Sequence, residues 1–408
     1  MRFAIFSHVE HSEREGRYYA YAPYVREMNI WLKYVQKVEV VAPVRLPPKG
    51  EVARQHCYQH EYLTYTTIPS FHFLNLRGAV KAVIKIPYIL YKILGAMKRA
   101  DHLHLRCPGN IGLLACICQI FFPSKSKSTK YAGNWDPEAK QPLSYRFQKW
   151  LLSNTYLTRN MQVLVYGEWP GQSKNVVSFF TASFSENEKN EVPKKAFSEP
   201  FIFVFVGNLV EGKRPLEAIK LVERLNFKLR EGTDQEIPAS YILMKLELYG
   251  DGPEREKLKA YVRENNLEQL ISIKGNRSLE ELKEAYQKAH FVILPSKSEG
   301  WPKALAEGMF FGCIPVATPV SCVPWMLDYG KRGILLEEFS QRLTANSQRL
   351  KRSGQRTEDR GQDGGKIIKL LADREKMKKM SEAASEWSQQ YTLEKFEAAI
   401  RKILNNKP

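Results

Sequence analysis

Short apolar runs alternate with amphipathic segments throughout the second half of the chain. The apolar runs, typical of buried strands, are residues 201–209, 241–253, 270–275, 290–296 and 314–320. The amphipathic segments, which repeat apolar residues at helical spacing, are residues 215–227, 254–266, 278–289 and about 302–311. Strands that alternate with helices predict parallel βαβ units covered on both faces. Such a doubly wound domain binds ligands at the carboxyl ends of its strands.

The first half repeats this alternation less regularly. Its predicted strands are residues 1–7, 38–43, 102–107, 128–133 and 162–167, and its clearest helices are residues 24–35 and 79–99. The fold class is therefore α/β, with two Rossmann-like doubly wound domains that we expect to face each other across a cleft. The predicted parts are an N-terminal domain (1–185), a polar linker (186–200), a C-terminal domain (201–387) and a C-terminal helix (about 388–408) that packs back on the first domain.

Length and charge narrow the functional classes. A chain of 408 residues is too long for one core, so two domains are expected. The net charge is +18, and residues 1–189 hold 25 basic and 13 acidic side chains, so most of the excess lies in the first half. Nucleic acid, an anionic membrane surface and phosphorylated substrates all suit such a charge. Because no nucleic-acid-binding motif is recognisable, nucleic acid is not an expected partner.

The hydropathy pattern also bears on location. The longest uncharged apolar run, residues 111–122, is shorter than the roughly 20 residues that a membrane-spanning helix needs. The start, MRFAIFSHVEHSE, turns charged at once and predicts a buried strand rather than a signal peptide. We therefore expect a cytoplasmic protein, with peripheral attachment at the inner face of the cell membrane as a further expectation. The polar segment 349–365 predicts an exposed insertion.

The stretch SKSEGWPKALAEGM (296–309) predicts a strand, a turn and a helix that begins near Pro302. Backbone amides of Gly300, Trp301, Lys303 and Ala304 would then point out of the helix start and form an anion site.

Glu299 and Glu307 lie on either side of this turn. Their separation does not suit the close pair, about 5 Å apart, of a retaining glycosidase. It suits contact with two distant hydroxylated parts of one elongated ligand. The alternative is that Glu307 is a solvent-facing helix residue and Glu299 a solvated loop charge.

A second group lies in VFVGNLVEGKRP (204–215). Gly207 closes a strand and permits close backbone approach, while Lys213 and Arg214 stand at the start of the next helix. Cations there can meet a phosphate with charge-assisted hydrogen bonds. The alternative is a pair of solvated side chains.

In order and spacing, VGNLVEGKRP, LYGDGPEREKL and IKGNRSLEELKEAYQKAHFVILPSKSEGWPKALAEGMFFGCIPVAT resemble family-4 glycosyltransferases, which are retaining, nucleotide-sugar-dependent enzymes of the GT-B fold. The resemblance covers about residues 201–337, and E-x7-E at Glu299 and Glu307 is its most specific element. It implies that Glu299 contacts the donor sugar, Glu307 the ribose, and Lys213 the diphosphate, helped by the amides of 300–304. Asn276 and Arg277 would border the base. It also implies no metal and no cofactor, since the nucleotide sugar is a substrate.

Two positions depart from the family pattern. Asn208 stands where the family usually has an arginine directly after the strand-ending glycine, and Arg214 is a candidate substitute. In HLHLRCPGN (102–110), Arg106 stands where the family often has a histidine near the reacting sugar. Because an arginine cannot act as a base at neutral pH, Arg106 would act electrostatically, on phosphate or acceptor. The alternative is a structural arginine at a strand end.

The loop after the first strand is charged and aromatic, where the family commonly has a glycine-rich turn. His8, Glu10, His11 and Glu13 are acid–base candidates for the acceptor hydroxyl, and the alternative is that the loop only shapes acceptor binding. Trp135, in KYAGNWDP, is a candidate to stack on an acceptor sugar ring.

The helix predicted over residues 79–99 carries Lys81, Lys85 and Lys92 on one face. It is either a domain helix packed on the sheet or a basic surface that touches anionic lipid. The sequence as a whole predicts a glycosyltransferase that uses a nucleotide-sugar donor and a glycan or lipid-linked acceptor in cell-surface polysaccharide biosynthesis. A nucleotide-sugar 2-epimerase of GT-B fold and a non-catalytic nucleotide-sugar-binding protein are the alternatives.

Overall fold

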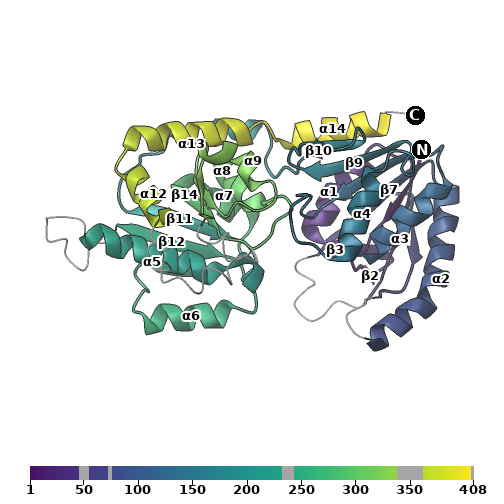
Figure 1. The fold of residues 1–408 in the computed structure, drawn as a ribbon, viewed down its shortest axis with the longest axis horizontal. Coiled ribbons are helices and arrows are strands. Elements are labelled where there is room, and N and C mark those ends of the chain that lie inside the picture. The colour runs from purple at the N-terminus through teal and green to yellow at the C-terminus, as the bar shows by residue number, and fades with distance from the viewer. Residues whose placement is uncertain (46–54, 72–75, 232–242, 338–361, 406–408) are drawn as a thin grey trace. The chain divides into compact units, whose positions relative to one another are not determined.

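The chain divides into two structural units. The computed structural model describes residues 1–45, 55–71, 76–231, 243–337 and 362–405 (Figure 1). The first unit comprises Met1–Thr181 together with Glu394–Pro408, and the second comprises Ala182–Leu393. Among the described residues, no helix is both long and apolar enough to cross a membrane.

A seven-stranded parallel sheet forms the centre of the first unit, in the order β10-β9-β8-β7-β1-β4-β6. Its strands are β1 (Arg2–Phe6), β4 (Lys37–Ala42), β6 (Leu63–Thr67), β7 (His102–Cys107), β8 (Ser126–Tyr131), β9 (Met161–Tyr166) and β10 (Val176–Phe179). Helices cover the sheet, so β1 (RFAIF) and β9 (MQVLVY) are largely buried and mostly apolar. The neighbouring strands β7 (HLHLRC) and β8 (SKSTKY) are also mostly buried, although their sequences are partly or mainly polar. All five strands predicted from the sequence are present in this sheet, whereas β6 and β10 were not predicted.

Helices cover the two faces of this sheet unequally. They are α1 (Ala22–Leu32), α2 (Leu76–Arg99), α3 (Asn110–Cys118), α4 (Leu143–Ser153) and α14 (Leu393–Asn405), with the 3-10 turn η2 (Gln119–Phe121) after α3. The chain passes from β1 through α1 to β4 in one direction along the sheet. It passes from β6 through α2, α3 and α4 to β7, β8 and β9 in the opposite direction. Because such crossovers are right-handed, α2, α3 and α4 share the face opposite α1 (Figure 1).

The charged loop after β1 folds into a hairpin, which the sequence did not predict, and with a later strand it forms a small antiparallel sheet. Its strands are β2 (Ser12–Arg14), β3 (Arg17–Tyr21) and β5 (Gln55–Cys57). Glu15 and Gly16 form the two-residue turn between β2 and β3, and both have positive φ, at 51° and 72°. This is the geometry of a type I′ hairpin turn. The loop is therefore an ordered hairpin.

The second unit is built on a six-stranded parallel sheet in the order β13-β12-β11-β14-β15-β16. The strands are β11 (Phe201–Val206), β12 (Met244–Tyr249), β13 (Ile271–Gly275), β14 (Phe291–Leu294), β15 (Ile314–Ala317) and β16 (Ile334–Leu335). The helices are α5 (Pro215–Glu231), α6 (Arg255–Glu264), α7 (Leu279–Lys288), α8 (Lys303–Phe310), α9 (Val323–Met326), α12 (Gln362–Leu371) and α13 (Arg374–Ser388). The 3-10 turns are η3 (Asn187–Glu191), η4 (Glu211–Lys213) and η5 (Asp328–Gly330). Strand–helix alternation is thus present as predicted.

Three neighbouring strands of this sheet end at glycine. Gly207 follows β11, Gly250 follows β12 and Gly275 ends β13. Gly250 has a φ of +141°, and a Cβ atom there would lie 1.9 Å from the carbonyl oxygen of Gly207. Only glycine fits this approach of two backbones. At the carboxyl ends of β11 and β12, the edge of the sheet is therefore formed by backbone atoms rather than by side chains.

Two segments differ from the sequence-based boundaries. The polar segment 186–200 packs on the second unit, where Lys195 Nζ donates to the carbonyl oxygens of Tyr286 at 2.6 Å and Gln287 at 2.9 Å. The C-terminal helix predicted over about 388–408 begins only at Leu393, so the tail holds two helices, α13 and α14. The chain turns between Ser388 and Leu393, where the Leu393 amide donates to the carbonyl of Phe184.

The second of these tail helices, α14, belongs to the first unit. Phe396 packs there against the rings of Phe179 and Phe180. Of the predicted insertion 349–365, residues 349–361 lie outside the described residues, and 362–365 begin α12.

Candidate functional site

Lys213 and Glu299 form an ion pair at the carboxyl edge of the second sheet. Lys213 ends η4, after β11, and Glu299 lies in the loop between β14 and α8. The Lys213 Nζ is 2.5 Å from Glu299 Oε1, and Glu299 is only 8% exposed. Its carboxylate is therefore not a solvated loop charge. The same two segments are joined by an ion pair between Lys297 and Glu211 and by a hydrogen bond from the Lys297 amide to the carbonyl of Gly212.

The helix that follows Glu299 begins one residue later than predicted. Pro302 is the N-cap and α8 starts at Lys303. The Lys303 amide donates to the carbonyl of Trp301 at 2.9 Å, so it is already used. Within the described part of the chain, the amides of Gly300 and Ala304 have no protein acceptor. These two amides can therefore bind an anion at the helix start.

The Trp301 side chain has a packing role. Its indole is buried, and its ring lies 6.2 Å from that of Trp387 and 5.6 Å from that of Tyr391. Trp325 packs against Trp387 in the same cluster. This cluster fixes the turn that carries Glu299 and the helix start, so a ligand could reach Trp301 only through its backbone.

Glu307 lies on α8, and protein donors already contact both of its carboxylate oxygens. Ser183 Oγ donates at 2.6 Å and the Tyr286 hydroxyl at 3.1 Å. Burial raises the pKa of Glu307, and the hydrogen bonds from Ser183 and Tyr286 oppose this rise. Each oxygen keeps a second lone pair. Glu307 is therefore not the solvent-facing residue of the alternative interpretation, because it accepts hydrogen bonds from Ser183 and Tyr286. Sequence reasoning missed Ser183 and Tyr286, because no motif or spacing in the sequence distinguishes these two residues as partners of Glu307.

The other predicted donor residues lie at the ends of β11 and β13. Asn208 is exposed directly after Gly207, and Arg214 adopts a left-handed conformation with φ of 52° as it leads into α5. Asn276 and Arg277 follow β13, where Arg277 pairs with Glu281 at 3.3 Å. Glu281 also forms a capping box with Ser278 at the start of α7, so the Arg277 side chain is linked to that helix.

In the first unit, Arg106 is part of a buried ion cluster. Its guanidinium donates to Glu27 at 2.8 Å, and Lys130 lies 2.9 Å from the other carboxylate oxygen of Glu27. Lys130 is 1% and Arg106 12% exposed as side chains. The geometry favours the structural alternative for Arg106, although the two cations exceed the one carboxylate by one positive charge. Sequence reasoning missed Glu27 and Lys130, which stand in apparently ordinary helix and strand positions.

Two residues predicted to contact the acceptor, His11 and Trp135, are instead buried against other protein groups. His11 is buried, and its ring nitrogens contact the carbonyl of Val9 at 2.7 Å and the hydroxyl of Tyr58 at 2.9 Å. Burial lowers the pKa of His11 to about 4, so it is a neutral structural histidine. Trp135 is buried against Tyr131, with ring centroids 4.8 Å apart, which leaves no face for a sugar ring. Both differ from the expectation because apolar neighbours enclose them.

His8 and Glu10 remain at the surface of the first unit. The His8 ring lies against Gly109, where a Cβ atom would be 2.5 Å from its Nδ1. The resulting desolvation and the positive charge of Arg106 lower the pKa of His8. Glu10 pairs with Arg45 at 2.5 Å. Of the two, His8 lies at the carboxyl end of β1 and is the better placed to meet a ligand.

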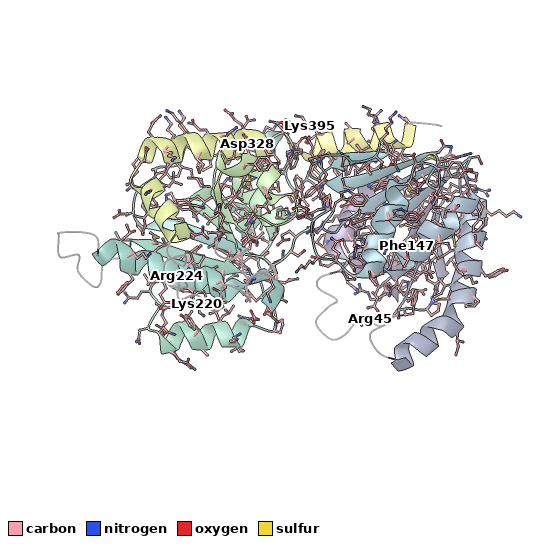
Figure 2. The ribbon with its side chains drawn as sticks, in the orientation of Figure 1. Arg45, Phe147, Lys220, Arg224, Asp328 and Lys395 are labelled. Atoms are coloured by element: carbon pink, nitrogen blue, oxygen red, sulfur yellow. The ribbon has the colours of Figure 1, made fainter. Side chains whose placement is uncertain are left out.

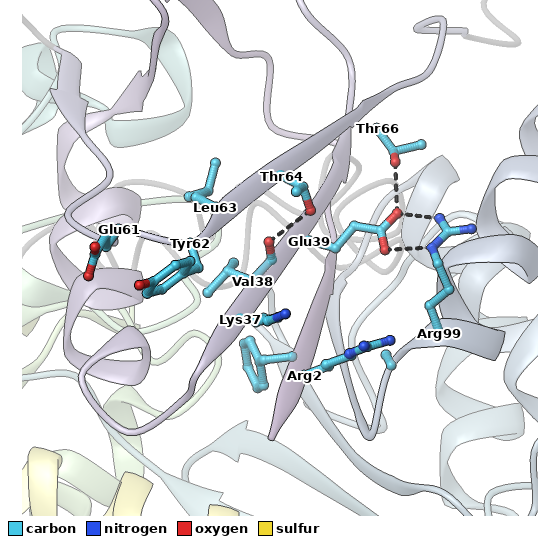
Figure 3. A pocket seen from close by; sticks show the side chains of 12 residues that line it. Arg2, Lys37, Val38, Glu39, Glu61, Tyr62, Leu63, Thr64, Thr66 and Arg99 are labelled. Carbon is cyan, nitrogen blue, oxygen red and sulfur yellow. Dashed lines mark hydrogen bonds and ion pairs between the residues drawn. The ribbon is translucent and has the colours of Figure 1, made fainter.

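A hollow of about 530 Å³ lies elsewhere in the first unit (Figure 3). Arg2, Lys37 and Leu63, where β1, β4 and β6 begin, line it, so it is at the amino ends of the strands. Inside it, Arg99 pairs with Glu39 at 2.5 Å. None of the predicted site residues lines this hollow. Among the described residues, no cluster of three or more His, Cys, Asp or Glu side chains could hold a metal ion.

Both units, with their parallel sheets, match solved structures of the GT-B fold, which is therefore the fold of this chain. HepE from Anabaena in complex with UDP aligns with a TM-score of 0.61 at 14% identity, over 99% of this chain and 98% of that one. The lipopolysaccharide outer core galactosyltransferase WaaB aligns with a TM-score of 0.60 at 12% identity, over the full length of both.

The family model matches mainly the second unit. Residues 186–364 match the model of the family "Glycosyl transferases group 1". An uncharacterized glycosyltransferase from Methanocaldococcus jannaschii is 29% identical over 156 residues, or 38% of this chain and 39% of the relative. A putative colanic acid biosynthesis glycosyltransferase, WcaL of Escherichia coli, is 29% identical over 167 residues, or 38% of each chain. The matched segments thus span about two fifths of these relatives.

Proposed function

We propose that this protein is a retaining glycosyltransferase that moves a sugar from a nucleoside-diphosphate sugar to a glycan or lipid-linked acceptor in cell-surface polysaccharide biosynthesis. The ion pair of Lys213 and Glu299, beside the open amides of Gly300 and Ala304 at the carboxyl edge of the second sheet, carries this proposal. The match of residues 186–364 to group 1 glycosyl transferases supports it. So do the relatives named for colanic acid biosynthesis.

The chemistry of this edge suits a nucleoside-diphosphate sugar. We expect the diphosphate to meet Lys213 and the two amides, and the sugar hydroxyls to meet Glu299, whose second oxygen is not used by Lys213. Glu307 would accept hydrogen bonds from the ribose through its remaining lone pairs, and Asn276 and Arg277 would border the base. The ion pair keeps Lys213 and Glu299 in place. Preorganised groups of this kind lower the ordering cost of binding.

For the reaction, we propose attack on the same face of the sugar that the diphosphate leaves. The bond from the anomeric carbon to phosphate oxygen breaks, a bond to the acceptor oxygen forms, and the acceptor proton passes to a phosphate oxygen. Lys213 and the helix start would stabilise the charge that grows on the diphosphate. We expect the reaction to proceed without a metal, and unchanged turnover in excess chelator would be the direct check.

The acceptor belongs to the first unit in this proposal. His8, at the end of β1, is the surface group best placed to meet it, while Arg106 and Lys130 add a net positive charge beneath the same edge. We further propose that the protein works in the cytoplasm, at the inner face of the cell membrane.

A thermal-shift panel of UDP-, GDP- and ADP-sugars tests the donor assignment. A ligand at about 100 times its Kd should stabilise the protein by about 2.7 kcal/mol. UDP-sugars come first, because HepE of the same fold has been solved with UDP-glucose. In the Glu299→Gln variant, the thermal shift produced by the active nucleotide sugar should fall more than the thermal shift produced by the nucleoside diphosphate without its sugar. If no nucleotide sugar shifts the wild type, the proposal fails. Turnover of a nucleotide sugar without any acceptor would identify an epimerase instead.

A further inference from the structure

Three neighbouring helices of the first unit expose large apolar side chains on their outer surface. They are Ile84, Tyr88 and Tyr91 on α2, Ile117 and Phe121 on α3 and η2, and Leu143, Phe147 and Trp150 on α4. We call these residues the outer apolar face. The helices lie in one layer (Figure 1), and Phe147 is labelled on α4 in Figure 2. Ile84, Tyr91, Phe121 and Leu143 are each more than 70% exposed.

Each helix already has a separate buried face toward the sheet. On α4, Gln148, Leu151 and Leu152 are buried, whereas Leu143, Phe147 and Trp150 recur at i, i+4 and i+7 on the other side. A helix that covers a sheet needs one apolar stripe, and the opposite side is normally polar. The second stripe is therefore not required by the core. Apolar residues gathered in this way mark a contact surface.

The charge of the same helices has one sign. Together α2, α3 and α4 contain eight Lys and Arg residues and no Asp or Glu. One of these cations lies over an exposed ring of the face, with Lys92 Nζ 5.4 Å from the Tyr88 centroid. In the segment after α4, the Arg159 guanidinium lies 4.5 Å from the centroid of the exposed Tyr156 ring. Lys140 and Arg146 are exposed on either side of Leu143. The face thus combines aromatic rings, aliphatic side chains and positive charge.

We propose that the outer apolar face binds the headgroup region of an anionic lipid bilayer. Tyr and Trp prefer the membrane interface, where an apolar ring meets a polar edge, and Lys and Arg reach the lipid phosphates. A second copy of the chain fits less well, because a two-fold contact would place the basic helices against each other. Nucleic acid fits less well too, because Ile84 and Leu143 have no base-stacking surface.

The purpose of this contact rests on the proposed function, since a lipid-linked acceptor must be met at a membrane. The contact itself does not, because it depends only on the surface of the first unit. Vesicle binding and donor binding are therefore measured separately, and either can fail while the other holds.

Co-sedimentation with vesicles tests the proposal with the full chain. Vesicles of phosphatidylcholine with 30% phosphatidylglycerol, a composition we choose for the assay, should bind the protein, and vesicles of phosphatidylcholine alone should bind it far less. The pair K140E/R146E should weaken binding at least about 25-fold, at about fivefold per near-surface cation. The pair F147S/W150S should weaken it at both low and high salt.

Matched controls lie on the second unit. Lys288→Glu combined with Lys331→Glu removes two exposed lysines, and Phe227→Ser removes an exposed aromatic ring. These variants should sediment as the wild type does, and all variants should retain the wild-type thermal shift with a nucleotide sugar. Equal sedimentation of F147S/W150S and the wild type overturns the proposal. The proposal is also overturned if the protein does not bind vesicles but binds DNA or self-associates, and the face variants abolish that binding.

Brominated lipids provide a direct measure of insertion. They should quench part of the tryptophan fluorescence of the wild type, and Trp150→Phe should remove most of that quenching while vesicle binding persists. Unchanged quenching in Trp150→Phe would place the contact on another surface and overturn the assignment.

Discussion

The ammonium group of Lys213 lies 2.5 Å from a carboxylate oxygen of Glu299, which follows it by 86 positions in the chain. The pair joins the segment after β11 to the segment after β14, and these two strands are neighbours in the sheet. Parallel strands bring such segments together at one edge. A cation and a buried carboxylate are thus held side by side at this edge.

Replacing Lys213 with Ala should weaken binding of the active nucleotide sugar about 10- to 100-fold. The loss corresponds to one charge-assisted hydrogen bond of about 1.5–3 kcal/mol to the diphosphate. Calorimetric titration of the wild type and the variant measures it. Lys297→Ala is the matched control, because Lys297 pairs with Glu211 between the same two segments. An equal loss in both variants would assign the effect to loop order rather than to phosphate contact.

The architecture could be predicted because it depends on periodicity. Most of the buried parallel strands are apolar runs, and their covering helices have amphipathic spacing, so both sheets were largely visible in the sequence. The β2–β3 hairpin was missed because its strands are short and polar, and its type I′ turn rests on Glu15 and Gly16 rather than on a common Asn-Gly pair. Short polar strands carry little periodic signal.

Only those residues of the candidate site that follow the ends of predicted strands could be predicted from the sequence. Lys213 and Glu299 were expected at the carboxyl edge, and the structure brings them together. The partners of Glu307 could not be foreseen, because Ser183 and Tyr286 reach it from a loop and from α7. Trp135 was assigned to a ligand from its residue type alone, whereas burial depends on tertiary neighbours that the sequence does not reveal.

Replacing Glu307 with Ala should destabilise the second unit by about 1–3 kcal/mol. The buried hydroxyl of Tyr286 would lose its acceptor, and an unpaired buried donor costs that much. Urea unfolding measures the change. In the double variant with Tyr286→Phe, which removes the donor, the cost of Glu307→Ala should become smaller. If the two changes are additive, the hydrogen bond does not stabilise the fold. Glu307→Gln should keep most of the stability yet weaken donor binding.

Stability should fall as the pH falls from about 6.5 toward 4, because buried histidines stay neutral in the folded state. Burial lowers the pKa of His11 to about 4 and that of His102 to about 3. Since an unfolded histidine takes up a proton near pH 6.5, protons favour unfolding in this window by about 1.4 kcal/mol per pH unit for each residue. Urea unfolding of His11→Gln across this range should show a shallower slope. A slope equal to that of the wild type would mean that His11 titrates normally when folded.

Replacing Gly250 with Ala should destabilise the second unit by more than about 3 kcal/mol. The new Cβ would lie 1.9 Å from the Gly207 carbonyl oxygen, and the backbone there also has positive φ. Gly212→Ala is the matched control, because nothing lies within 4 Å of the Cβ position at Gly212. It should change the free energy of unfolding by less than about 0.5 kcal/mol. Comparable losses in both variants would contradict the close approach of the two strand ends.

Replacing Asn208 with Arg should strengthen donor binding. Asn208 is exposed directly after Gly207, where the family that the sequence resembles usually has an arginine. A guanidinium there could form a charge-assisted hydrogen bond to the diphosphate, which corresponds to about a tenfold lower Kd for the active nucleotide sugar. Titration at two salt concentrations measures the gain, which should shrink as salt screens the charge. Asn208→Gln, which adds length without charge, is the control. If Asn208→Arg binds the donor no better than Asn208→Gln, then the diphosphate does not lie against the end of β11, and Arg214 would be the next residue to replace.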